Sequence, residues 1–169
     1  MNPVGVVLRW GLVVSSAVVV QSAVTPHLAL WGVVPNLMVI LAVCAGLSGG
    51  AQRGAVVGFW VGLAFDVARP VPLGLSALAY TIVAFGAGTV QVVLVQAGRV
   101  ISMLLVSAAS VFGVLLYAVI GEVFGTNSLS HPRLAAILVV ESLVAGALSR
   151  VGLRVAVWSD GPDVRAVAE

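Results

Sequence analysis

Long apolar runs, separated by short polar or glycine-rich breaks, are the main pattern along this chain. The runs lie at Val4–Val24, Leu37–Leu47, Gly54–Asp66, Leu73–Val95, Val100–Phe124 and Leu134–Val157. As helices at about 1.5 Å per residue, the first run and the last three are long enough for the ~30 Å hydrocarbon core of a bilayer. The pattern therefore predicts an all-α polytopic membrane protein with six transmembrane helices, of which the second and third are short.

The short second and third runs have two interpretations. As helices they reach only about 20–24 Å, so they either span a locally thinned bilayer or form a re-entrant hairpin. A hairpin would leave Arg53, in the connection between the runs, inside the membrane at a cost of several kcal/mol. Full spanning is therefore favoured.

The arginines test this division of the chain. With six spans, both termini share one side of the membrane. That side then carries Arg9, Arg53, Arg99, Arg150, Arg154 and Arg165, and the other side carries Arg69 and Arg133. Positive charge accumulates on the cytoplasmic side of membrane proteins. We therefore expect the cytoplasmic membrane as the location, with both termini inside.

Composition agrees with a membrane protein. Hydrophobic residues make up 61% of the 169 residues and charged residues only 8%, whereas soluble domains carry about 25% charged residues. There is no basic, aromatic-interleaved surface for nucleic acid. We expect one transmembrane domain over residues 1–157 and a short cytoplasmic tail over 158–169.

Residues that could support catalysis or bind a metal or cofactor are few. Cys44 lies within an apolar run, and His27 and His131 fall in separate loops, which is a poor set of metal ligands. Gly46–Gly50 matches G-x-S-x-G, but a nucleophile elbow needs a strand before the serine and a histidine and acid within reach. A glycine turn ending a helix is the better interpretation. We expect no cofactor, no metal and no enzymatic activity.

Three glycines mark the third run. Gly54, Gly58 and Gly62 recur every four residues, so they follow one helix face, with Phe59 beside them. Glycine lets another helix backbone approach closely. The stripe predicts either helix packing within this chain or docking of a partner's transmembrane helix.

Acidic residues within or near the apolar runs are the other candidate sites. Asp66 ends the glycine face and has Arg69 three residues on, a spacing that suits an ion pair or a contact with a partner or substrate. Glu141 lies about 12 Å inside the last run, where a lone carboxylate is costly, so it is either a hydrogen-bonded structural acid or a functional one. Glu122 lies closer to a helix end, where it can reach water.

Three segments of the chain together resemble a known family. They are Pro35–Leu37, the pattern G-x-x-x-G-F-x-x-G-L-x-x-D over Gly54–Asp66, and Pro72–Leu78. This combination is similar to the rod shape-determining protein MreD family, which usually has an acid where this chain has Asn36. The resemblance implies a bacterial inner-membrane subunit of the elongation machinery that binds MreC and acts with MreB, RodA and a class B penicillin-binding protein.

The resemblance also implies a fold like that of the substrate-binding S components of energy-coupling-factor transporters. A non-enzymatic scaffold for cell-wall synthesis is the first functional hypothesis. A small-solute-binding subunit of a transporter is the alternative, motivated by the short spans and by Glu141. An intramembrane enzyme is a distant third.

Overall fold

The computed structural model describes residues 3–24, 33–69, 72–91, 98–125 and 132–160, and within them the fold is built from α-helices. The helices are α1 (Pro3–Val19, extended by a π-helical turn at Val20–Val24), α2 (Leu37–Gly49), α3 (Ala51–Val67), α4 (Leu75–Thr89), α6 (Arg99–Val123) and α7 (Leu134–Asp160). Three helical segments, Val4–Ala23, α6 and α7, are long and apolar enough to cross a membrane. The all-α class is therefore confirmed, together with three apolar helices of spanning length, whereas the described helix α4 has 15 residues and is shorter than the expected span Leu73–Val95.

The boundary between α2 and α3 is sharper than the sequence predicts. A break over residues 48–53 was expected, but the two helices are separated only by Gly50, whose φ of 84° lies in a region that favours glycine. The backbone N–H of Gly50 donates to the carbonyl of Gly46 at 2.9 Å and closes α2. The third helix consequently begins at Ala51, three residues before the expected start.

Helix α2 forms the centre of the molecule. All its residues from Met38 to Ser48 are buried, as expected for a helix that is apolar around its whole circumference. It contacts α3, α4, α6 and α7, and α1 to a lesser extent. Because protein rather than lipid surrounds it, a 13-residue helix does not have to match the bilayer thickness by itself.

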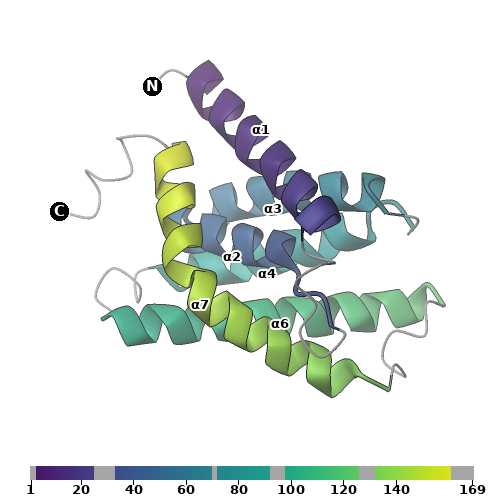
Figure 1. The fold of residues 1–169 in the computed structure, drawn as a ribbon. Helices are drawn as coiled ribbons and strands as arrows, with labels where there is room; N and C mark the ends of the chain where they lie inside the picture. Colours follow the sequence, from purple (N-terminus) through teal and green to yellow (C-terminus); the bar gives the residue numbers. More distant parts are fainter. Residues whose placement is uncertain (1–2, 25–32, 70–71, 92–97, 126–131, 161–169) are drawn as a thin grey trace.

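The other helices surround α2 unequally (Figure 1). Helices α3 and α4 form the most extensive helix pair, and α6 pairs with α7. Helix α1 crosses the outside of the bundle, and only 6% of the residues in its apolar stretch within Val4–Ala23 are buried. The molecule thus has a tightly packed inner part and one peripheral helix.

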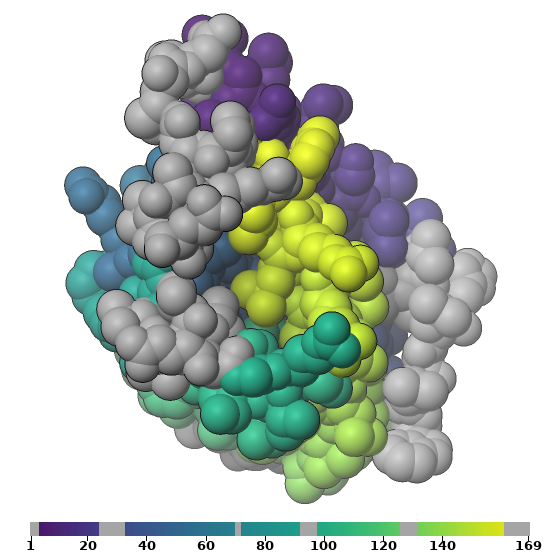
Figure 2. Space-filling view, turned by 90° about the vertical axis from the view of Figure 1, so that its left-hand side faces the viewer, coloured from purple at the N-terminus to yellow at the C-terminus, as the bar shows by residue number. Residues whose placement is uncertain are grey.

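Helix α7 extends to Asp160, beyond the expected end at Val157. Ser159 and Asp160 are buried, so they belong to the packed bundle, although the expected tail began at residue 158. In Figure 2 the end of α7 lies between α1, α3 and the start of α6. Other predicted features, including His27, His131 and Arg165, lie outside the described residues.

Candidate functional site

The glycine face of α3 packs against α4. A Cβ added to Gly54 would lie 2.5 Å from the Ala84 carbonyl oxygen, and one added to Gly58 would lie 2.6 Å from that of Tyr80. A Cβ on Gly62 would lie 2.5 Å from the Ala77 Cα. Each step of four residues along α3 thus matches a step of about four back along α4. We call this antiparallel contact between α3 and α4 the glycine seam.

Phe59 does not belong to the glycine seam. Its side chain is 44% exposed and meets the neighbouring Trp60 edge-on, with ring centroids 5.7 Å apart. Trp60 is 60% exposed. The two rings therefore form an aromatic pair on the outer surface of α3, away from the glycines.

Asp66 caps the next helix, an arrangement that differs from the two alternatives left open by the sequence, an ion pair with Arg69 or a contact with a partner or substrate. One oxygen of the buried carboxylate accepts from the backbone N–H groups of Gly74 at 2.8 Å and Ser76 at 3.1 Å. A negative group suits the positive end of a helix dipole and satisfies donors that have no partner within the helix. The guanidinium of Arg69 instead lies 4.9 Å from the Phe65 ring centroid.

A second polar cluster, the N-terminal cluster, covers the start of α2. The first N–H groups of a helix have no partner within it, and here all four at residues 36–39 are satisfied by side chains. Glu141 accepts from the N–H of residue 36 at 2.7 Å, and Gln21 accepts from that of residue 37 at 2.8 Å. The Asn36 side chain accepts from the next two at 3.1 and 3.4 Å. Glu141 therefore has a structural partner.

The cluster also joins separate helices. The Asn36 amide donates to the Tyr80 hydroxyl of α4 at 2.5 Å, and the Gln21 amide donates to the Pro35 carbonyl at 3.0 Å. Glu141 is 1% exposed, and its other oxygen, Oε1, has no hydrogen-bond partner within the described protein. Glu122, the other acid expected to be of interest, is half-buried near the end of α6.

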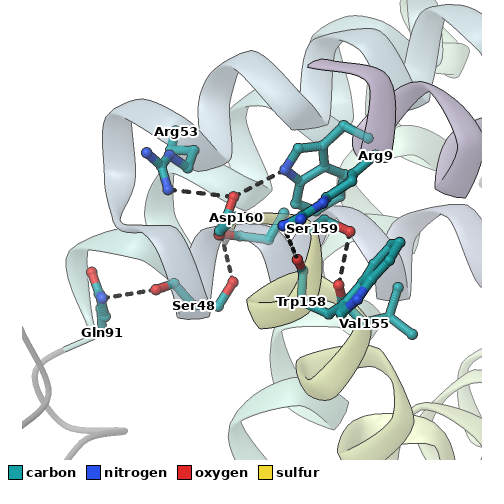
Figure 3. Close-up of polar contacts among 10 residues, drawn as sticks. Arg9, Ser48, Arg53, Gln91, Val155, Trp158, Ser159 and Asp160 are labelled. Carbon is teal, nitrogen blue, oxygen red and sulfur yellow. Dashed lines mark hydrogen bonds and ion pairs between the residues drawn. The ribbon is translucent and has the colours of Figure 1, made fainter. Parts of the chain in front are cut away.

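A third group, the C-terminal cluster, lies at the opposite end of α2 (Figure 3). One carboxylate oxygen of Asp160 accepts from the Trp10 indole N–H at 2.9 Å and forms an ion pair with Arg53 at 3.4 Å. These three residues come from α7, α1 and α3. A single buried carboxylate therefore ties three helices together at this end of the molecule.

The neighbouring G-x-S-x-G segment belongs to the end of α2. The Ser48 hydroxyl donates to the Ala45 carbonyl within the same helix at 3.3 Å, and the Ser48 carbonyl accepts from the Gln91 amide at 3.0 Å. Both bonds satisfy groups at a helix end. The segment forms the glycine turn predicted from the sequence.

Sequence reasoning missed most residues of the two clusters. Asn36 directly before an apolar helix was a readable signal, since asparagine is a favoured N-cap. The contact between Trp10 and Asp160 joins positions 150 residues apart, and no spacing in the sequence indicates it. The polar side chains of the candidate sites thus share one feature: each satisfies backbone groups at a helix end or joins two helices. Within the described residues no group of three or more potential metal ligands occurs.

Comparison with known proteins identifies a family. The model of the family described as rod shape-determining protein MreD matches residues 1–149. No match was found among curated proteins or among solved structures. The family match covers every described helix except the last part of α7.

Proposed function

Because this chain belongs to the rod shape-determining protein MreD family, we propose that it is a non-enzymatic subunit of the bacterial elongation complex. In this role it is a scaffold for MreC and for the peptidoglycan synthases, which are RodA and a class B penicillin-binding protein. It acts together with MreB to maintain cell shape. The family match over residues 1–149 carries the proposal. The polar clusters support it, because their side chains satisfy helix ends and join helices.

The aromatic pair on α3 is the partner contact that we propose for MreC. The glycines and Asp66 are used inside the chain, whereas Phe59 and Trp60 face outward. Aromatic side chains supply large contact area to a partner helix. We propose that a transmembrane helix of MreC packs on this side of α3.

Co-purification tests the MreC contact. Replacing Phe59 and Trp60 together with alanine should leave the level and thermal stability of the protein unchanged but reduce the amount of MreC recovered. Phe112→Ala is the matched control, because Phe112 is an exposed ring on α6. Undiminished recovery of MreC by the double variant, or equal loss in the control, would contradict this contact.

We further propose that six helices span the membrane and that both termini are cytoplasmic, in a fold like that of S components. The C-terminal cluster supports this, because it brings Arg53 to the same end of the bundle as the end of α7, where Arg9 also donates to the Trp158 carbonyl. Cysteines at Gln52 and Phe124, both exposed, should react with an impermeant maleimide from opposite sides. The parent protein is the control, because its buried Cys44 should not react.

The alternative function, binding of a small solute, has one specific observation in its favour. Oε1 of the buried Glu141 has no partner in the described protein, so it could accept a hydrogen bond from a ligand. Glu141→Gln keeps an oxygen for the N–H of Asn36. If the variant remains stable and complements a deletion strain for cell shape, solute recognition at Glu141 is not needed for function.

A further inference from the structure

An apolar groove separates α1 from the bundle. It has a volume of about 510 Å³ and is lined by α1, α2 and α7, with almost no polar surface. Leu12 and Ala17 contribute from α1, Ile40 from α2, and Val151 and Trp158 from α7. This volume falls within the ~300–1,000 Å³ that is typical of ligand pockets in proteins.

Polar contacts attach α1 to the bundle on either side of the groove, and apolar side chains such as Val14 and Val18 pack against the core between them. Trp10, about halfway along α1, bonds to Asp160, and beyond the last regular turn Gln21 bonds to residues at the start of α2. Between these attachments the α1 side of the groove includes the small residues Ser16 and Ala17. Small side chains between these two attachments leave space that they cannot fill.

A positive charge lies at one end of the groove. Arg9 precedes the lining residues Leu12 and Val13 by three and four positions, so it continues the same face of α1. Its guanidinium lies 5.4 Å from the Trp158 ring centroid and donates to the Trp158 carbonyl at 3.4 Å (Figure 3). Neither contact neutralises its charge, whereas the nearby Asp160 forms its ion pair with Arg53.

We propose that this groove binds one acyl chain of an anionic phospholipid, with the lipid phosphate held by Arg9. Apolar walls suit the chain, and an arginine beside a tryptophan at the groove end suits a headgroup at the membrane interface. Arginine is well suited to phosphate because its donors match two oxygens at once. A bound lipid would fill the space between α1 and the bundle and stabilise the position of α1.

Native mass spectrometry of the full-length protein tests the proposal. The protein is exchanged into detergent containing equal amounts of phosphatidylglycerol and phosphatidylcholine, and the ratio of the two bound lipids is measured. The parent protein should retain one phosphatidylglycerol in preference to phosphatidylcholine. Soluble glycerophosphate, added in excess, should not displace it, because the acyl chain provides much of the affinity.

Three variants assign the binding to the groove. Ser16→Trp should fill the groove and remove the bound lipid. Arg9→Gln should reduce the preference for phosphatidylglycerol about tenfold, as expected for loss of a charged hydrogen bond. Arg99→Gln removes an exposed charge at the start of α6 and is the matched control, so its preference should not change.

The lipid ratio separates recognition by Arg9 from a structural effect. If Arg9→Gln merely loosened α1, retention of both lipids would fall alike, and that result would overturn the role of Arg9. Retention of phosphatidylglycerol by Ser16→Trp would overturn the groove as the binding site. A lipid-free parent that forms dimers disrupted by Ser16→Trp would assign the groove to a second copy of the chain instead.

Discussion

Helices α4 and α1 both pack against the inner bundle, but they do so in opposite ways. Helix α4 meets α3 along its length through the glycine seam, with no space for even one added methyl group at Gly54, Gly58 or Gly62. Helix α1 is attached by polar bonds at Trp10 and Gln21 and by partly buried apolar side chains, and a groove of about 510 Å³ remains between it, α2 and α7. One interface therefore depends on close backbone packing along its length, whereas the other combines a few polar bonds with looser side-chain packing.

This difference shows when small residues bring helices together. Glycines bring two membrane helices into backbone contact only when they face the partner's backbone in register, as in the glycine seam. Gly5 and Gly11 of α1 have no atom within 4 Å of an added Cβ. Where small residues face no partner backbone, as Ser16 and Ala17 do along the groove, they leave a space instead.

The largest effect is expected from Gly62→Leu. The new side chain would begin 2.5 Å from the backbone of Ala77 and would force α3 and α4 apart. We expect a loss of about 3 kcal/mol or more in the free energy of unfolding, seen as a lower melting temperature and a lower level in the membrane. Gly11→Leu and Gly86→Leu are the controls, because neither site has an atom within 4 Å of an added Cβ.

A Gly62→Leu protein as stable as both controls would contradict the glycine seam. If instead Gly11→Leu were the more damaging substitution, the comparison between the two interfaces would be reversed. Measuring all three variants in the same detergent keeps the comparison direct.

A smaller effect is expected at the end of the seam, where Asp66 caps α4. Asp66→Ala leaves the N–H groups of Gly74 and Ser76 without their acceptor and should destabilise the protein by about 2 kcal/mol. Asp66→Asn retains one acceptor oxygen and should lose roughly half as much. Thermal unfolding of the two variants measures the order, and an asparagine variant less stable than the alanine variant would contradict a capping role.

The smallest effect is expected from Trp10→Phe, at the attachment of α1. The ring is kept while the bond to Asp160 is lost, which should cost about 1 kcal/mol. Hydrogen exchange measured by peptide should accelerate in α1 and remain unchanged in α3 and α4. Faster exchange throughout the protein would show that α1 is not an independent, weakly attached helix.

The sequence by itself determined the helices and the family. Long apolar runs exclude a soluble domain, and most helices begin and end within about three residues of the predicted positions, because glycine, proline and polar residues interrupt a helix locally. The exception is α4, which ends at Thr89 rather than at Val95. The spacing of Gly54, Gly58 and Gly62 indicated a close helix contact. The resemblance to MreD was confirmed by the match over residues 1–149.

Only the tertiary structure decided which partner each of these residues has. The glycines could have faced a partner protein, but they face α4. Asp66 caps α4 rather than pairing with Arg69, and Glu141 and Asp160 satisfy groups far away in the sequence. The physical reason is that a buried polar group must find a partner wherever the fold provides one. Local spacing in the sequence therefore predicts neither a partner that lies far away along the chain nor the groove beside α1.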